Sequence, residues 1–299
     1  MLYYDWFENH VRKILMYRIK QVPLAIAIAS LVALLTISGF FGTAANSQPP
    51  QPTSEITTTQ GIDLGRSFRE LGIEGSIVVY DQNKNQFYEH NAPRNSTAFF
   101  PASTFKIFNA LVALETGVIR DEVTVLTWDG IQRNIPAWNR DTNLRQGFKD
   151  STVWFYQVLA RKIGHERMQK FINQVGYGNR QIGTSEQIDR FWLDGPLKIT
   201  PKQEIEFLQR LYRNDLPFSQ RSLDLVKDIM VREQTPDYVL RGKTGWTDST
   251  TPGNGWFVGY LEQNKNVYFF ATNMDMRNDN DGVNRIEITR RSLQALGLL

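Results

Sequence analysis

The chain has 299 residues, of which 41% are hydrophobic and none is cysteine, and its 34 Lys and Arg against 31 Asp and Glu give a formal net charge of +3. These proportions support a large packed core and exclude disulfide frameworks, thiol nucleophiles and Cys-ligated zinc or iron–sulfur clusters. Because the whole chain has three histidines and no block of basic residues, we predict no metal site and no nucleic-acid partner.

The N-terminal segment, residues 1–45, has the composition of a membrane-targeting signal. No charged residue lies between Gln21 and Ser54, and residues 22–41 form a nearly continuous apolar run behind a cluster of Lys and Arg. Such a run is long enough to span a bilayer, and the upstream cations hold the N-terminus in the cytoplasm. The small residues at 43–45 suit a signal peptidase. We therefore expect export to the periplasm, with a cleaved signal peptide or a retained anchor at 22–41, and no other contact with a membrane.

Residues 46–60 are rich in Pro, Ser, Thr and Gln, which predicts a flexible tether, and the folded domain is expected over 61–299. The domain should open with a short helix over 63–71. Two strands then follow at 74–80 and 86–90, joined as a hairpin by an Asn-Lys-Asn turn.

The segment 101–115 predicts a buried central helix, since apolar residues cover most of its circumference. Ser103, Lys106 and Asn109 are spaced by three and therefore share one face. A buried ammonium is costly unless it is paired or loses its proton, so burial lowers the pKa of a lysine. Lys106 thus becomes a candidate base one helical turn from Ser103, a candidate nucleophile.

The second half of the chain predicts a helix, three strands and a closing helix. Thr200-Pro201-Lys202-Gln203 is a capping box with proline at the first helical position, and Ile205, Leu208 and Leu211 supply the buried face of the helix that follows. Strands are expected over 238–247, 256–262 and 267–274, and a helix over 284–296. Together with the largely helical middle, this order predicts an α+β fold, in which an antiparallel sheet is flanked by the N- and C-terminal helices and a mostly helical lobe is inserted.

Two further motifs carry side chains suited to chemistry. Gly242-Lys243-Thr244-Gly245 lies in a predicted strand, where the small Gly245 lets a substrate backbone lie along the strand edge. Lys243 offers a positive charge there, and the Thr244 hydroxyl can bond a carboxylate. Asp150-Ser151-Thr152-Val153 adds a second serine between the two lysines in chain order.

In this order, Ser-x-x-Lys, Ser-x-Val, Tyr177-Gly178-Asn179 and Lys-Thr-Gly resemble the motifs of penicillin-recognising serine enzymes, and specifically of the class D, oxacillinase-type β-lactamases. The resemblance extends through 128–164 and 177–212 and covers the chain from about Gly61 to its C-terminus. It implies the serine β-lactamase and transpeptidase-like fold.

The resemblance also implies roles for single residues. Ser103 would attack the β-lactam carbonyl. Lys106 would be the base, with carbon dioxide bound to it as a carbamate and no other cofactor. The other implied roles are proton transfer to the leaving nitrogen by Ser151, substrate binding by Lys243, Thr244, Gly245 and Arg285, an oxyanion hole from the backbone N–H groups of Ser103 and Trp246, and support of the carbamate by Val153 and Trp192.

The expected function is therefore hydrolysis of small-molecule β-lactams through a serine acyl-enzyme. A β-lactam sensor that stays acylated and a penicillin-binding protein remain alternatives with the same fold. Sensors usually carry several membrane spans before this domain, and penicillin-binding proteins normally show Ser-x-Asn in place of Ser-x-Val, so both are less favoured. A Ser-His-Asp hydrolase is excluded, because the chain has no Gly-x-Ser-x-Gly motif.

Overall fold

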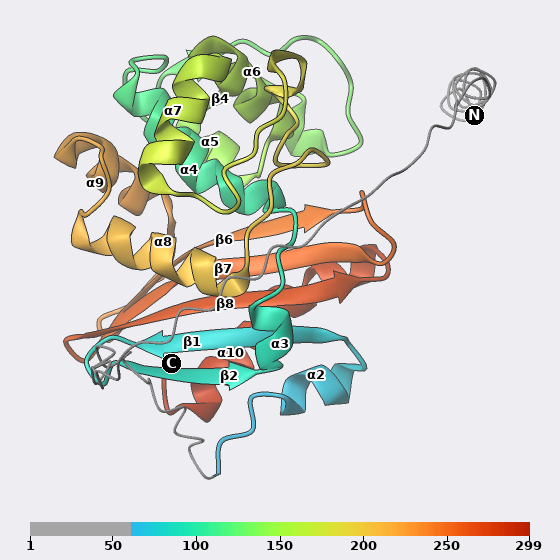
Figure 1. Ribbon diagram of the computed structural model, residues 1–299, viewed down its shortest axis with the longest axis vertical. Coiled ribbons are helices and arrows are strands. Elements are labelled where there is room, and N and C mark those ends of the chain that lie inside the picture. The colour runs from blue at the N-terminus through green and yellow to red at the C-terminus, as the bar shows by residue number, and fades with distance from the viewer. Residues whose placement is uncertain (1–60) are drawn as a thin grey trace, which may run out of the picture. The chain divides into compact units, whose positions relative to one another are not determined.

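The computed structural model describes residues 61–299, so the predictions for the targeting segment and the tether lie outside the described residues. Residues 61–299 form an α+β fold around a six-stranded antiparallel sheet with the order β2-β1-β8-β7-β6-β5 (Figure 1). The predicted fold class is confirmed. None of the helices in this part of the chain is long and apolar enough to cross a bilayer.

The sheet strands agree closely with the sequence prediction, except for one strand that the sequence did not indicate, β5. The strands of the main sheet are β1 Gly75–Asp81, β2 Gln86–His90, β5 Val231–Gln234, β6 Tyr238–Thr247, β7 Gly253–Gln263 and β8 Asn266–Met276. A second, two-stranded sheet pairs β3 Val125–Leu126 with β4 Thr142–Asn143. The unpredicted strands are short and carry no clear alternation of apolar and polar residues, which is the signal for a strand.

Helices cover both faces of the sheet (Figure 1). The helices are α2 Arg66–Leu71, α3 Ala92–Asn95, α4 Lys106–Glu115, α5 Leu144–Lys149, α6 Val153–Ile163, α7 His165–Val175, α8 Pro201–Arg213, α9 Gln220–Ile229 and α10 Asn284–Ala295, with short 3-10 turns η1 Ala102–Phe105, η2 Pro136–Trp138, η3 Ser185–Gln187 and η4 Asp279–Gly282. Helices α2 and α10 pack on one face, as predicted for the terminal helices, and α8 and the helical lobe lie on the other.

Strand β1 shows how the two layers meet, because all seven of its residues are buried. Successive side chains of a strand point to opposite faces. Ile77 and Val79 accordingly join the apolar core beneath α2 and α10, whereas Val78 and Tyr80 join the larger core that continues into the helical lobe. The sheet is therefore held between two separate cores.

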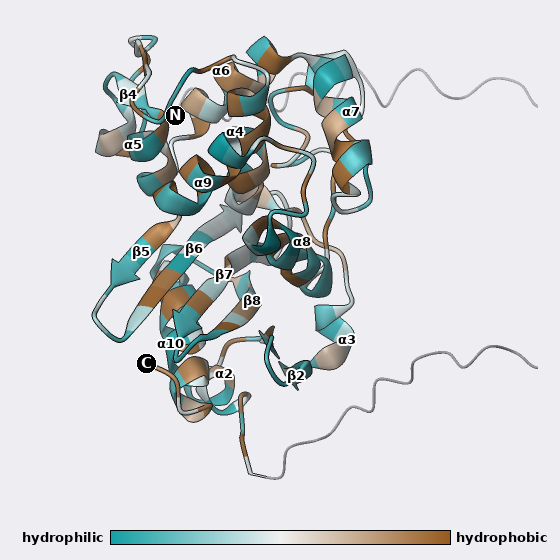
Figure 2. Cartoon of the chain, turned by 90° about the vertical axis from the view of Figure 1, so that its left-hand side faces the viewer, coloured by the Kyte–Doolittle hydropathy of each residue, from teal (hydrophilic) through white to brown (hydrophobic). Residues whose placement is uncertain are grey.

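The helices are anchored by the local signals that the sequence contains. Thr200 and Gln203 form the predicted capping box at the start of α8, with Pro201 in the first turn. The buried residues of α8 include the predicted Ile205, Leu208 and Leu211. Hydrophilic and hydrophobic residues occupy different sides of this helix (Figure 2), as expected when one side of a helix packs on a sheet and the other faces solvent.

The predicted helix over 101–115 is correct in position but begins differently. Residues 102–105 form the 3-10 turn η1, and the α-helix starts at Lys106. Ala102, just before Ser103, has φ of +50°, a left-handed conformation that a non-glycine residue seldom adopts. The first helix is also shorter than predicted and spans Arg66–Leu71.

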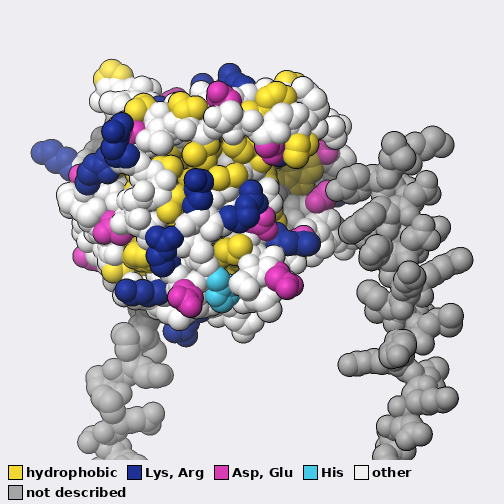
Figure 3. Space-filling model, turned by 90° about the horizontal axis from the view of Figure 1, so that it is seen from above, with side chains coloured by type: hydrophobic (Ala, Val, Ile, Leu, Met, Phe, Trp, Pro, Cys, Tyr) yellow, Lys and Arg dark blue, Asp and Glu magenta, His cyan; other side chains and the backbone are white. Residues whose placement is uncertain are grey.

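The surface of the helical lobe shows both signs of charge. Seen from above, Lys and Arg side chains are interspersed with Asp and Glu, and hydrophobic side chains show between them (Figure 3). This face therefore has no continuous basic field of the kind that binds nucleic acid.

Candidate active site

Ser103 lies in the turn η1, at the junction between the sheet and the helical lobe. The turn is tied to a distant segment, since Ala102 N–H donates to Trp192 O at 2.9 Å. Ser103 is 8% exposed, which leaves its hydroxyl within a largely dry site. A left-handed residue directly before the serine is the kind of backbone strain that clusters at functional sites.

Lys106 lies one turn after Ser103, as the sequence predicts. Its Nζ is 2.7 Å from Ser103 Oγ, and the lysine is 1% exposed. Burial lowers the pKa of Lys106 to about 7. Its other neighbour is the ring of Tyr156, with Nζ 5.2 Å from the ring centroid. Near neutral pH a substantial fraction of Lys106 is therefore an uncharged amine, able to take a proton from the serine hydroxyl.

Ser151 and Lys243 meet although 92 residues separate them in the chain. Lys243 Nζ donates to Ser151 Oγ at 3.0 Å and to Thr244 O at 2.9 Å. Ser151 has φ of +57° and comes directly before the N-cap of α6. Lys243 is 1% exposed, and burial, followed by the charges of Lys106 and two arginines, holds its pKa well below the usual value.

The edge of β6 beyond Arg241 is the part that faces η1. Strand β5 pairs with β6 only as far as Val231, which lies opposite Arg241. The last hydrogen bond on this side of β6 is donated by Gly242 N–H to Met230 O, at 2.9 Å. A side chain at Gly245 would place its Cβ 3.0 Å from Pro101 O. The glycine is therefore required for the close approach of β6 to the turn that carries Ser103.

Three more of the predicted site residues lie along or behind this edge. Arg285, from the start of α10, donates through Nη1 to Gly245 O at 2.6 Å. Burial and, next, the charge of Arg232 lower the pKa of Arg285 to about 10. Thr244 is half-buried in the strand, and Trp246 is 37% exposed beyond it.

Trp192 is fully buried, and its indole Nε1 has no hydrogen-bond partner among the described residues. The indole ring stacks on Phe105, the residue before Lys106, with ring centroids 5.3 Å apart. An indole N–H is a donor only, so this atom calls for an acceptor. Val153, the first residue of α6, is half-buried two positions after Ser151.

In the segment Tyr177-Gly178-Asn179, the side chain of Asn179 bonds backbone groups of a distant segment. Asn179 Oδ1 accepts from Lys198 N–H at 3.1 Å, and Asn179 Nδ2 donates to Pro196 O at 2.8 Å. Gly178 has φ of +52°, and a Cβ there would lie 2.2 Å from Lys198 O. The motif thus fastens the loop after α7 to the segment that follows Trp192.

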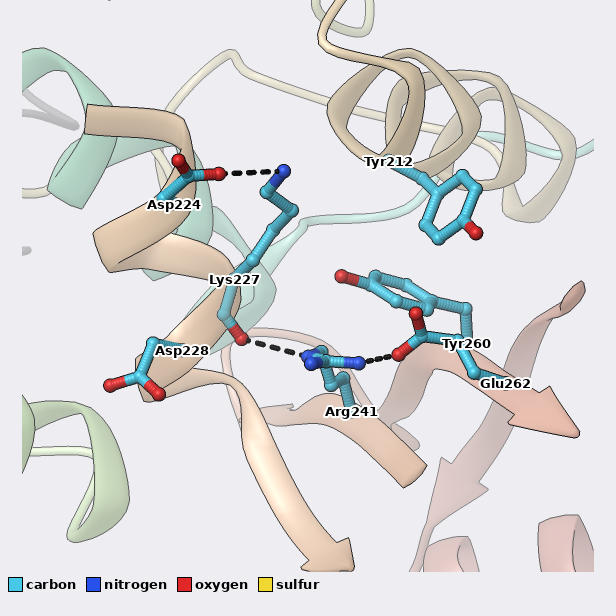
Figure 4. Close-up of a pocket in the computed structure, with 7 residues that line it drawn as sticks. All are labelled: Tyr212, Asp224, Lys227, Asp228, Arg241, Tyr260 and Glu262. Carbon is cyan, nitrogen blue, oxygen red and sulfur yellow. Dashed lines mark hydrogen bonds and ion pairs between the residues drawn. The ribbon is translucent and has the colours of Figure 1, made fainter. Parts of the chain in front are cut away.

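A cavity of about 250 Å³ lies elsewhere, lined by Arg241 of β6, by Tyr260 and Glu262 of β7 and by residues of α8 and α9 (Figure 4). Its charged groups are largely paired with one another: Arg241 with Glu262, and Lys227 Nζ with Asp224 Oδ1 at 3.0 Å. It contains none of the candidate catalytic residues. The candidate active site is therefore the one around Ser103, apart from this cavity. Among residues 61–299 no group of three or more His, Cys, Asp and Glu side chains is arranged to hold a metal ion.

Two residues near the site were not predicted from the sequence. Arg232, in the irregular stretch of β5, is close enough to Lys243 and Arg285 to lower the pKa of both. Glu204, fully buried on α8, contacts Thr104 beside the candidate nucleophile. The spacing of Glu204 with Leu208 and Leu211 places it on the apolar face of α8, which is the signal that would have identified it.

Comparison with known proteins agrees with this geometry. Residues 74–294 match the family model of the penicillin-binding protein transpeptidase domain. The chain is 46% identical over 209 residues to the β-lactamase OXA-48 of Klebsiella pneumoniae. The aligned region covers 70% of this chain and 78% of that protein. The solved structure of a class D β-lactamase, YbXI from Nostoc, is 74% identical in sequence and superposes with a TM-score of 0.79. The match covers 80% of this chain and 100% of the Nostoc chain.

The chain belongs to the class D serine β-lactamases. The probable β-lactamase YbxI of Bacillus subtilis is a further relative, 35% identical over 268 residues that cover 90% of this chain and 97% of that protein. The family assigned from the sequence motifs is thus confirmed, and with it a serine hydrolase that acts on β-lactams. The class D enzymes share the fold described above, in which the motifs of this chain converge.

Proposed function

We propose that this class D β-lactamase opens its substrate by attack of Ser103 Oγ on the β-lactam carbonyl carbon, with Lys106 as the base. The observation that carries the proposal is the buried pair of Ser103 Oγ and Lys106 Nζ at 2.7 Å. Because no carboxylate contributes to the pKa of Lys106, burial alone brings it to about 7, and the amine can take the serine proton at neutral pH.

Ser151 is the proposed route for the proton that the leaving nitrogen needs. When the ring C–N bond breaks, the nitrogen takes the proton of the Ser151 hydroxyl. The hydroxyl then regains a proton from the groups next to it. Lys243 Nζ lies 3.0 Å from Ser151 Oγ and keeps this hydroxyl oriented. Both groups are largely buried, so the proton is not lost to bulk water.

The same region offers groups for the substrate carboxylate and for the developing oxyanion. Lys243, Thr244 and Arg285 surround the free edge of β6, and the side-chain-free Gly245 lets a substrate lie against the strand. The backbone N–H groups of Ser103 and Trp246 are the proposed oxyanion-hole donors. Loss of one such donor typically costs about 3 kcal/mol of transition-state stabilisation.

The residues around Lys106 fit a carbamate formed with carbon dioxide. That group requires an unprotonated amine, dry walls and a donor, and these are supplied by the lowered pKa of Lys106, by the buried faces of α4 and α6 with Val153, and by the unpartnered Nε1 of Trp192. When bound, a carbamate would supply an anionic oxygen base at the end of the Lys106 side chain. Trp192 would hold it by donating its indole N–H, and Lys106 would position it beside Ser103.

Release of the product completes the cycle. Water attacks the ester carbonyl of the acyl-enzyme while Lys106 takes one of the water protons. The bond from that carbon to Ser103 Oγ then breaks, and Lys106 returns the proton to the serine oxygen.

Export of the chain through its N-terminal segment would bring the site to the compartment where β-lactams act. We propose the periplasm as its location on the composition of residues 1–45.

The proposal is tested by incubating the protein with a penicillin, with and without bicarbonate, while ring opening and intact mass are followed. We expect many turnovers that increase with bicarbonate, no adduct in Ser103→Ala, and a persistent adduct or no reaction in Lys106→Ala. Turnover in the serine variant would contradict the mechanism. A stoichiometric adduct that never clears from the unmodified protein would instead indicate a sensor.

A further inference from the structure

Glu204 is a buried acid with no role in the mechanism above. It lies in the first turn of α8 and is 0% exposed. Its Oε1 is 2.6 Å from Thr104 Oγ1 and 3.2 Å from the hydroxyl of Tyr177. Thr104 is the residue after Ser103, so one atom of Glu204 connects the catalytic turn to the Tyr-Gly-Asn segment.

The hydrogens available at this junction indicate which group donates. Thr104 Oγ1 also lies 2.8 Å from Pro101 O, a carbonyl that can only accept. The threonine hydroxyl has one hydrogen, so it can donate to only one of these two oxygens, and in the arrangement that we infer it donates to Pro101 O. The contact between Thr104 and Glu204 is then a hydrogen bond only if Glu204 supplies the proton, that is, if Glu204 is an uncharged carboxylic acid. Tyr177 donates its own hydroxyl hydrogen to the same oxygen.

The surroundings of Glu204 favour the acid form. Burial raises the pKa of Glu204 to about 7, and this effect outweighs the contacts of Glu204 with Thr104 and Tyr177. Tyr177 is the titratable group that faces it, and burial holds the pKa of this tyrosine well above its usual value. No Lys, Arg or His in the described part of the chain contributes to the pKa of Glu204.

We propose that Glu204 is a positioning residue for acylation: as a neutral acid it donates a hydrogen bond to Thr104 and so fixes the turn that carries Ser103. This inference rests on the proposed role of Ser103. The turn is strained at Ala102, and Thr104 Cγ2 also limits how closely β6 can approach at Gly245. A bond that holds Thr104 therefore holds both the nucleophile and its distance from the strand.

The experiment measures the acylation rate constant for a penicillin, from pH 6 to pH 9.5, in the full chain. Glu204→Gln keeps an N–H donor for Thr104 and cannot ionise, whereas Glu204→Leu removes the donor. At pH 7 we expect the acylation rate constant of Glu204→Gln to be within about threefold of the wild-type value. Glu204→Leu should acylate about 10 to 100 times more slowly, which is the effect of losing one buried hydrogen bond.

The pH profile separates positioning from a merely structural role. Above pH 7 Glu204 ionises and can no longer donate, so wild-type acylation should decline on the alkaline side. Glu204→Gln should lack that decline while keeping the acid-side rise that belongs to Lys106. An alkaline decline that is identical in both proteins would overturn the proposal.

Matched controls make the result specific. Leu208→Ala removes a fully buried side chain one turn later on α8, so it lowers the melting temperature but should leave acylation within about threefold below that temperature. Thr104→Val should slow acylation as Glu204→Leu does, and the double variant should be no slower than either single one. The inference would be refuted if the losses of acylation rate in Glu204→Leu and Thr104→Val were additive in the double variant. It would also be refuted if Glu204→Leu, like Leu208→Ala, lowered the melting temperature without slowing acylation.

The same set of proteins distinguishes this inference from the mechanism beneath it. If Ser103→Ala still forms an adduct, the proposed function fails whatever Glu204 does. If Ser103→Ala is inert and Glu204→Leu acylates normally, only the role of Glu204 fails. Should Glu204→Leu not fold, the pH profile of Glu204→Gln and the rate of Thr104→Val still decide the question.

Discussion

Lys106 shows how a residue that harms stability can be kept for its chemistry. The side chain is nearly fully buried, with Ser103 Oγ as its hydrogen-bond partner, and among residues 61–299 no carboxylate contributes to its pKa. An uncompensated ammonium in such a place is costly, so the fold favours the neutral amine. The proposed base is therefore available because the core around Lys106, made largely by α4 and α6, excludes water.

The cost of burying Lys106 should appear in the pH dependence of stability. Its pKa falls from 10.5 to about 7 on folding, so the unfolded chain binds more protons between these values and stability rises with pH across that window. Below pH 7 the full cost remains, on the order of 4 kcal/mol. We expect Lys106→Met to unfold at higher denaturant concentration than the wild-type protein at pH 7, to lose this advantage near pH 10, and to hydrolyse no penicillin.

Lys170→Met is the matched control, because Lys170 is exposed on α7. It should change neither the stability difference between pH 7 and pH 10 nor the turnover. The account of Lys106 would be contradicted if Lys106→Met were less stable than the wild-type protein at pH 7.

At this scale the sequence predicted local pairs and missed distant ones. Ser103 and Lys106 were placed together because the helical period brings residues three apart onto one face. The contact of Ser151 with Lys243 crosses 92 residues and was not predicted, since the family resemblance implied only a separate role for each residue. Glu204 was missed because a carboxylate is rarely fully buried, although its spacing with Leu208 and Leu211 places it on the apolar face of α8.

Among the elements, β6 and η1 are set against each other by one glycine. A methyl group at position 245 would lie 3.0 Å from Pro101 O and 3.2 Å from Thr104 Cγ2. We predict that Gly245→Val separates the strand from the turn and lowers kcat/KM for a penicillin by at least about 100-fold, measured by ring opening. An unchanged kcat/KM would show that the two elements need no such contact.

The loop that contains Tyr177 to Asn179 has a supporting role that can be tested separately. Asn179 bonds Lys198 N–H, Pro196 O and Gln181 N–H with one side chain. We expect Asn179→Ala to lower the free energy of unfolding by about 2 kcal/mol, by denaturant unfolding, and to leave kcat nearly unchanged well below the melting temperature.

Asn173→Ala is its control, since Asn173 is exposed on α7 and its Oδ1 accepts a hydrogen bond from Gln169 Nε2 at 2.9 Å. Its effect on stability should be within about 0.5 kcal/mol. Equal losses for the two variants would mean that the Asn179 bonds contribute nothing specific.

Elements were predictable where periodicity or a cap was strong. Strand β6 and the capping box of α8 agree with the sequence, whereas η1 was predicted as a full α-helix because its residues carry no helix-breaking signal. The 3-10 geometry is imposed from outside, by the bond of Ala102 N–H to Trp192 O. Strand β5 depends on pairing with β6 and has only four residues, too few for a pattern.

For the whole molecule, the catalytic unit is expected to be independent of the first 60 residues. The match to the solved Nostoc enzyme covers 80% of this chain and the whole of the Nostoc chain. The Nostoc enzyme therefore corresponds in length to the described domain. We predict that a protein beginning at Gly61 folds and keeps kcat and KM within about twofold of the full chain, by ring-opening assays of both proteins in detergent. Loss of activity that refolding does not restore would assign the N-terminal segment a part in the active domain.

The central claim is that Ser103 and a bicarbonate-dependent Lys106 turn over β-lactams within one buried site. Single-turnover mixing with a penicillin, followed by intact mass at bicarbonate concentrations from zero to saturating, tests it most directly. The account predicts a transient adduct on Ser103 whose decay accelerates with bicarbonate in the wild-type protein and is abolished in Lys106→Ala. An adduct on another residue, or decay that does not depend on Lys106, would contradict it.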